Sequence, residues 1–250
     1  MQIDLAVIGG SGFYDWPELQ KVEQLKVSTE YGEPSAPLTV GYLEGKCLAF
    51  MPRHGLTHSV PPHAINYRAN IAALKSLGVT EVVGVNAVGG IHADMLAAAH
   101  LVVPDQIIDY SHGRITSFFD LPGDAMAHID FTEPYCRLLR AQLKQAIEAL
   151  ELPGHFFATY GCTQGPRLET KAEIARLERD GCDIVGMTGM PEAGLAREAG
   201  LNYACLSTVV NPAAGKSDSL IEMSDIEKAM ILGVSRAKQV LQQLFATLKK

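Results

Sequence analysis

The sequence predicts an α/β fold in which a central, largely parallel β-sheet is covered by helices on both faces. Short apolar runs alternate with segments of helical periodicity along the 250-residue chain, and such alternation is typical of a parallel sheet with crossover helices. No linker, repeat or low-complexity segment interrupts it. We therefore expect a single domain over residues 1–250, a length that suits one large α/β domain.

Glycines and polar residues mark the ends of the predicted elements. A short apolar run that stops at glycine is typical of a buried strand, and helical spacing that stops at Gly78 is typical of a helix end. Thr170 followed by Glu173 forms a capping-box pattern. Strands are predicted within residues 3–12, 45–55, 81–91, 100–110, 155–170, 182–187 and 202–210, and helices over 66–78, 134–151, 171–181, 191–199 and 224–249.

Composition and charge exclude several classes of protein. The net charge of −7 argues against a nucleic-acid-binding protein, which normally carries a basic patch. The five cysteines are scattered without a C-x-x-C pair, which favours reduced thiols in a cytosolic protein. No signal-peptide pattern and no apolar run of membrane-spanning length is present. We therefore expect a soluble cytoplasmic protein that binds neither nucleic acid nor membrane.

Several predicted strands end in glycine-rich or polar loops, and ligand sites of open α/β sheets lie beyond such strand ends. The loop at residues 9–12 offers backbone N–H groups to an anion, although it could equally be a plain strand-to-helix turn. Arg53 and His54 are a sharper signal, because a guanidinium binds phosphate bidentately and an imidazole adds a donor; an exposed basic pair is the alternative. The loops at 86–90, 165–169 and 187–192 could join the same site, or be turns and helix starts.

The sequence lacks the patterns of a metal site or a covalent nucleophile. It has no H-E-x-x-H, no Cys/His cluster and no G-x-S-x-G elbow. Gly-Lys-Ser at 215–217 is not a P-loop, because that motif needs a glycine where Val210 stands. We expect no metal and no organic cofactor. An anion site without either favours displacement by a bound anion.

Several motifs in fixed order span the chain: IGGSGFYD, MPRHG, PPHAINYRANI, NAVGGI, TQGPRLET and VGMTGMPEAGLAREAGLNYACLS. With these motifs the sequence resembles the nucleoside phosphorylases of the trimeric type, the 5′-methylthioadenosine phosphorylase and purine nucleoside phosphorylase family. The resemblance implies a mixed-sheet α/β fold and a homotrimer with sites near the subunit interfaces. It also implies a pentosyltransferase that cleaves a purine N-glycosidic bond with inorganic phosphate as co-substrate.

The resemblance also implies roles for individual residues. Met187 and Leu168 would lie in the nucleoside site, and His128 would be lent by a neighbouring subunit to the 5′ end of the substrate. On this assignment Arg53 contacts only the anion, so Arg53→Ala would raise the phosphate KM and spare purine binding. The phosphate site would comprise Ser11, Arg53, His54, Asn86, Ala87 and Thr188.

Three departures from the adenine-specific pattern concern the base. Asn211 and Ala213 stand where the methylthioadenosine enzymes have aspartates, and Glu169 stands where they have serine. Asparagine can donate to O6 and accept from a protonated N7, whereas ionised aspartate can only accept. Glu169 can accept from N1–H of a 6-oxopurine, and adenine N1 carries no proton. The sequence therefore predicts hypoxanthine or guanine as the base.

The 5′ end depends on weaker observations. The resemblance implies that purine nucleoside phosphorylases bind the 5′-hydroxyl with a C-terminal histidine, and this chain has none after His155. Leu220, Met223 and Ile226 could surround a thioether, although apolar residues at helical spacing are also typical of plain core. Together the two ends predict 5′-methylthioinosine. The alternatives are inosine or guanosine, then 5′-methylthioadenosine, and a non-catalytic nucleotide-sensing protein on the same scaffold.

Overall fold

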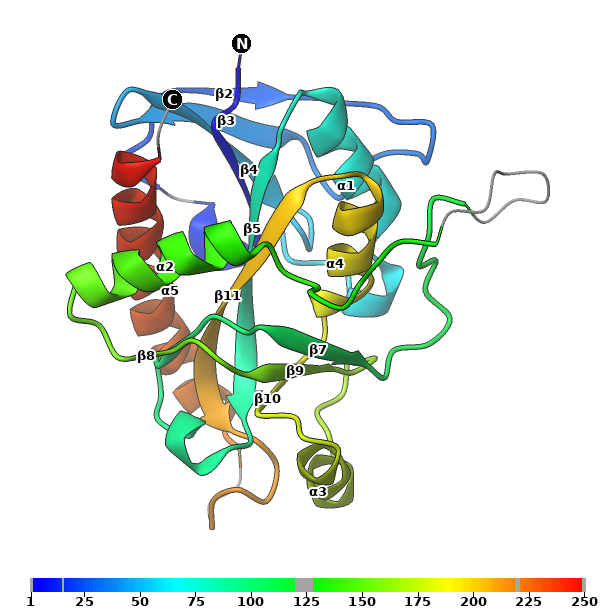
Figure 1. Cartoon of the computed structure of the whole chain (residues 1–250), viewed down its shortest axis with the longest axis vertical. Coiled ribbons are helices and arrows are strands. Elements are labelled where there is room, and N and C mark those ends of the chain that lie inside the picture. Colours follow the sequence, from blue (N-terminus) through cyan, green and yellow to red (C-terminus); the bar gives the residue numbers. More distant parts are fainter. Residues whose placement is uncertain (1, 15, 120–127, 219–220, 249–250) are drawn as a thin grey trace.

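The computed structural model describes residues 2–14, 16–119, 128–218 and 221–248. Their strands form one mixed sheet of eleven strands, with helices on both sides (Figure 1). Four parallel strands make its centre, in the spatial order β4 (Lys46–Pro52), β1 (Leu5–Gly9), β5 (Glu81–Gly90) and β11 (Asn202–Pro212). The predicted fold class, a mixed and largely parallel sheet flanked by helices, is confirmed.

The sheet continues beyond the long β5–β11 pair in two directions. The end of β5 pairs antiparallel with β10 (Ile184–Gly186), which is followed by β9 (Thr159–Cys162) and β7 (Gln106–Asp109). On the other side β11 pairs with β6 (Leu101–Val102), and β6 pairs with β8 (Gly154–His155). The β5–β11 pair is therefore the point at which these two parts of the sheet meet.

An antiparallel edge was not predicted from the sequence. β3 (Leu38–Leu43) pairs with β4, and β2 (Gln20–Leu25) pairs with β3. Four of the six residues of β2 are polar and the strand is largely exposed, so it lacks the apolar run that identifies a buried strand. β2 forms because its backbone hydrogen-bonds to β3. This contact depends on the tertiary structure and not on the local sequence.

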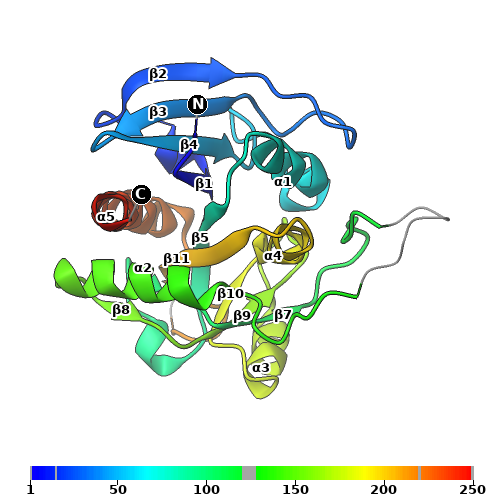
Figure 2. The ribbon, with the colours of Figure 1, turned by 45° about the horizontal axis from the view of Figure 1, so that its top comes forward.

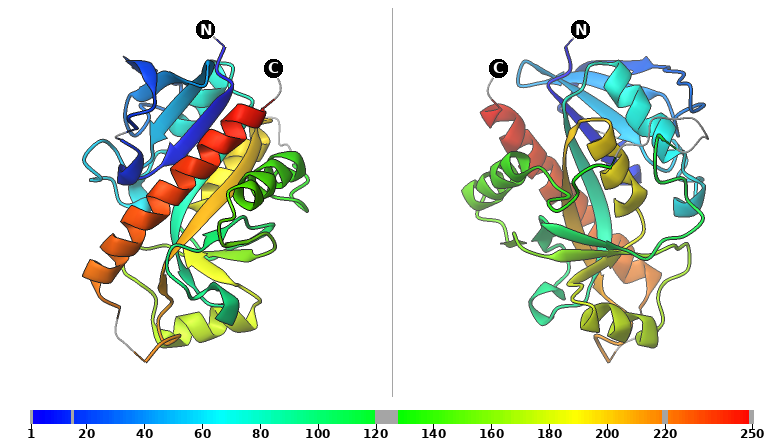
Figure 3. Two further views of the ribbon diagram at one scale, coloured as in Figure 1. Left: turned by 90° about the vertical axis from the view of Figure 1, so that its left-hand side faces the viewer. Right: turned by 45° about the vertical axis from the view of Figure 1, so that its right-hand side comes forward.

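The helices cover the two faces of the sheet (Figures 2 and 3). α1 (Tyr67–Ser76) and α4 (Gly189–Glu198) pack on one face, and α2 (Arg137–Ala149) and α5 (Met223–Thr247) pack on the other. Leu5 and Val7 of β1 face α2 and α5, and Ala6 and Ile8 face α1 and α4, as the two-residue period of a strand requires.

Local sequence accounts for the helix starts. α3 (Lys171–Arg179) begins with the predicted capping box, since Thr170 accepts from the Glu173 backbone and Glu173 accepts from the Thr170 backbone. Asn66 caps α1 by accepting from Ala69 N. Short 3-10 turns lie at Ser11–Phe13, Pro62–Ala64 and Ala93–Met95. In the described part of the chain, no helix combines the length and hydropathy needed to cross a bilayer.

Candidate active site

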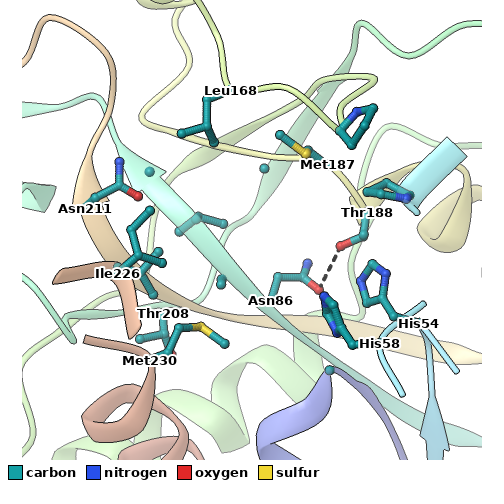
Figure 4. A pocket seen from close by; sticks show the side chains of 18 of the residues that line it. His54, His58, Asn86, Leu168, Met187, Thr188, Thr208, Asn211, Ile226 and Met230 are labelled. Atoms are coloured by element: carbon teal, nitrogen blue, oxygen red, sulfur yellow. Dashed lines mark hydrogen bonds between the residues drawn. The ribbon is translucent and has the colours of Figure 1, made fainter. Parts of the chain in front are cut away.

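A cavity of about 750 Å³ lies at the carboxyl ends of β1, β4 and β5, beside β11 and the start of α4. The first turns of α5 form its remaining wall, and Figure 4 shows the side chains that point into it. Twelve of the fourteen predicted site residues line this one cavity: Arg53, His54, Asn86, Ala87, Leu168, Glu169, Met187, Thr188, Asn211, Ala213, Met223 and Ile226.

Two predicted site residues do not line the cavity of this chain. His128 is exposed and is not part of the lining. The Ser11 side chain is outside the described structure, although its backbone belongs to the turn between Gly10 and Phe13, both of which line the cavity. Leu220, considered for the 5′ end, also falls outside the described residues.

Arg53 is buried in an ion pair that the sequence did not predict. Its Nε and Nη2 donate to the two carboxylate oxygens of Glu192, at 2.7 and 2.8 Å, and only 2% of Arg53 and 1% of Glu192 are exposed. Nη1 and Nη2 also donate to the carbonyls of Val85 and Ile8. Burial opposes the charge, but the adjacent carboxylate outweighs it and raises the pKa of Arg53 above its ordinary value.

The expectation that Arg53 contacts only an anion is therefore wrong. Its fork is occupied by Glu192, and one N–H on Nη1 lacks a partner among the described residues. Glu192 also accepts from the Tyr203 hydroxyl at 2.8 Å. A Cβ at Gly84 would come within 2.9 Å of Glu192 Oε1, so glycine makes room for this buried network.

His54 has a defined tautomer. Its Nδ1 lies 2.9 Å from the carbonyl of Val60, and a carbonyl only accepts, so Nδ1 carries the proton. Burial, and secondarily the charge of Arg53, lower the pKa of His54 to about 4. At neutral pH its Nε2 is therefore an acceptor, which corrects the expected donor role. Toward a phosphate, this nitrogen would accept a hydrogen bond from a P–OH group.

The floor between these groups is polar and buried. The Thr188 hydroxyl donates to Asn86 Oδ1 at 3.3 Å (Figure 4). Asn86 Nδ2 in turn donates to Cys205 Sγ. Thr188 stands just before α4 and Asn86 stands in β5. The Thr188 hydroxyl has one hydrogen, so it can donate to an anion only by turning away from Asn86 Oδ1. The backbone N–H groups of Thr188 and Met190 already donate to the Tyr160 hydroxyl and to Cys162 Sγ.

Glu169 and Asn211 are two further polar residues of the cavity lining. The Thr163 hydroxyl donates to Glu169 Oε1 at 2.6 Å, so this carboxylate is oriented and Oε2 remains an acceptor. β11 extends beyond the predicted strand at residues 202–210 and includes Asn211. β11 continues to Pro212 past a bulge between Val209 and Asn211, and Asn211 Nδ2 donates to the Pro212 carbonyl at 2.6 Å. Its Oδ1 and second amide hydrogen remain available.

The wall formed by α5 is mainly apolar. Met223, Ile226, Met230 and Val234 line the cavity from successive turns. Of these, Met230 and Val234 were not predicted, although their spacing from Met223 follows the helical period and could have identified them. His58 was also missed; its ring lies 4.5 Å from that of His54, centroid to centroid.

This arrangement provides anion donors, an acceptor–amide pair and an apolar wall around one space. Such a set can hold an anion against the sugar carbon of a nucleoside while binding the base edge. Among the described residues, no three His, Cys, Asp or Glu side chains are grouped as metal ligands.

Comparisons with known proteins agree with this geometry. Residues 4–246 match the family model described as the phosphorylase superfamily. A Xylella fastidiosa protein named "Probable S-methyl-5′-thioinosine phosphorylase" is 54% identical over 225 residues, which are 90% of this chain and 94% of that protein. The "6-oxopurine nucleoside phosphorylase" of Pyrococcus furiosus is 46% identical over 90% of this chain and 86% of its own length.

Solved structures give the same result. A methylthioadenosine phosphorylase from an antarctic soil metagenomic library superposes with a TM-score of 0.92 at 36% identity, covering 98% of this chain and 86% of that one. The family and the enzyme class inferred from the motifs are thus confirmed. This chain belongs to the phosphorylase superfamily.

Proposed function

We propose that this protein cleaves S-methyl-5′-thioinosine with inorganic phosphate, giving hypoxanthine and 5-methylthioribose 1-phosphate. A phosphate oxygen forms a bond to C1′ while the C1′–N9 bond breaks. The electron pair of the C1′–N9 bond leaves with the purine. The sugar passes through an oxocarbenium-like state, so no protein nucleophile, metal or organic cofactor is required. The phosphate is held by the backbone N–H groups of the loop at residues 9–12, by the remaining Nη1 hydrogen of Arg53 and by the Thr188 hydroxyl, which turns from Asn86 Oδ1 to the anion. The P–OH group of the phosphate donates to His54 Nε2.

The observation that carries the proposal is that Glu169 and Asn211 both line the cavity and both keep hydrogen-bonding atoms free for a base. Glu169 Oε2 is an acceptor for N1–H of a 6-oxopurine, because Oε1 is held by Thr163. The Asn211 amide can donate to O6 and accept from a protonated N7, which stabilises the negative charge that develops on the leaving purine. The apolar side chains Met223, Ile226 and Met230 favour a 5′-methylthio group over a 5′-hydroxyl.

A phosphate-dependent activity panel tests this assignment. We expect kcat/KM to be highest for methylthioinosine, lower for inosine and guanosine, and lowest for methylthioadenosine and adenosine. A kcat/KM for inosine equal to that for methylthioinosine would contradict the 5′ assignment. A kcat/KM for methylthioadenosine above that for methylthioinosine would contradict the base assignment. The alternative of a non-catalytic sensor predicts no hypoxanthine release from any substrate.

We also propose that the enzyme is a cytoplasmic homotrimer in which His128 completes a neighbour's site. His128 is exposed and absent from the cavity of its own chain, as a residue lent across an interface would be. Light scattering should give three times the chain mass, and His128→Ala should raise the nucleoside KM more than the phosphate KM. A fully active monomer would contradict the proposal.

A further inference from the structure

Arg114 donates hydrogen bonds to several acceptors on two chain segments that contribute residues to the cavity lining. Its Nη1 donates to the carbonyl of Met187 at 2.8 Å and to that of Met190. Its Nη2 donates to the carbonyls of Thr163 and Gln164, at 3.2 and 2.9 Å, and its Nε donates to Gln164 Oε1 at 3.2 Å. One half-buried guanidinium thus satisfies acceptors on two separate segments of the chain.

Both segments carry cavity residues. The first runs from Thr163 to Glu169, and the second contains Met187 and Thr188. Arg114 does not itself line the cavity, so it can influence a bound substrate only through these segments. The planar fork of arginine fixes the directions of its hydrogen bonds, which a flexible ammonium cannot do.

The charge of Arg114 also distinguishes it from Arg53. Within the described residues, no carboxylate lies at ion-pair distance from Arg114, whereas Arg53 is neutralised by Glu192. Its charge is balanced by carbonyl dipoles, the amide of Gln164 and the Tyr67 ring, whose centroid lies 5.7 Å from the guanidinium carbon. Hydrogen bonds to neutral acceptors therefore hold Arg114 in place, without an ion pair.

We propose that Arg114 is a positioning residue that locks the base-binding and ribose-binding segments together in their reactive geometry. The proposal rests on the function proposed above, because it takes Glu169 and Met187 as substrate contacts. Without Arg114, four backbone carbonyls lose a donor, and the two segments are free to shift relative to one another. A displacement of about 1 Å at a reacting centre can cost about a hundredfold in rate.

The experiment compares Arg114→Ala, Arg114→Lys and Arg114→Gln with the wild type, using whichever nucleoside the wild type cleaves best. We expect Arg114→Ala to lose about a hundredfold in kcat/KM for that nucleoside, with a much smaller change in the phosphate KM. Arg114→Lys keeps the charge but not the fork, and Arg114→Gln keeps part of the hydrogen bonding but not the charge. The kcat/KM of both variants should remain well below that of the wild type.

Chemical rescue separates positioning from general stability. Millimolar guanidinium should restore part of the activity of Arg114→Ala, and methylammonium at the same concentration should not. Arg140→Ala is the matched control, since Arg140 is also half-buried and donates to a backbone carbonyl, that of Phe156, away from the cavity. It should behave as the wild type in kcat/KM.

Three results would overturn the proposal. They are near-wild-type kcat/KM in Arg114→Ala, full activity in Arg114→Lys, or a loss that follows the folded fraction and does not respond to guanidinium. If Arg114→Ala does not fold, the Lys and Gln variants decide the question. A wild type that cleaves no nucleoside would instead refute the proposed function, so the two failures are distinguishable.

Discussion

Replacing Asn211 by aspartate is expected to lower kcat/KM for methylthioinosine about tenfold or more. The aspartate would place an acceptor against O6 of the base, and a mispaired buried polar group costs about 1–3 kcal/mol. It would also face the Pro212 carbonyl, to which the Asn211 amide now donates. Activity toward methylthioadenosine should fall less or rise, because the amino group of adenine can donate to a carboxylate.

Glu169→Ser should add to this change of specificity. It removes the proposed acceptor for N1–H. Together with Asn211→Asp it changes two of the three positions that depart from the adenine-specific pattern and leaves Ala213 unchanged. The quantity to measure is the ratio of kcat/KM for methylthioinosine over methylthioadenosine in the wild type, both single variants and the double variant. Glu178→Ser is the control, because Glu178 is on the exposed side of α3 and does not line the cavity. A ratio that is constant in all four proteins would show that neither side chain reads the base.

Breaking the buried ion pair between Arg53 and Glu192 is expected to have the largest effect on stability. Glu192→Ala leaves the Arg53 charge buried without its carboxylate, and such a change typically costs about 3–5 kcal/mol in the free energy of unfolding. Arg53→Ala should cost a similar amount by leaving Glu192 uncompensated. Its effect is thus not confined to the phosphate KM, and kinetics of this variant must be corrected for its folded fraction.

Urea unfolding of these variants tests the assignment. The double variant Arg53→Met/Glu192→Leu should recover much of the lost stability, because it removes both charges, but should not recover saturation by phosphate. Glu133→Ala is the control, since the ion pair of Glu133 with Arg137 is exposed and exposed ion pairs contribute little to stability. If Glu192→Ala were no more destabilising than Glu133→Ala, the buried pair would not hold this part of the molecule together.

Some elements are determined by the sequence because their cause is local. The capping box of Thr170 and Glu173 lies within four consecutive residues, and the structure has it at the start of α3 as predicted. The apolar runs of β1, β5 and β11 identify buried strands wherever they pair. Since parallel strands direct their carboxyl ends to one edge, the loops beyond them were expected to share a site, and twelve predicted residues do line one cavity.

Other features were decided by tertiary structure alone. β2 is a strand only because β3 pairs with it, and β11 passes Asn211 because it follows β5 to Gly90. The sequence identified the side chains of the candidate site, but their hydrogen-bonding states depend on distant partners. Glu192 is 139 residues from Arg53, and the Val60 carbonyl makes His54 Nε2 an acceptor. Residue type limits what a side chain can donate or accept, and the neighbours that folding brings within about 3 Å decide which of those capacities remain for a ligand.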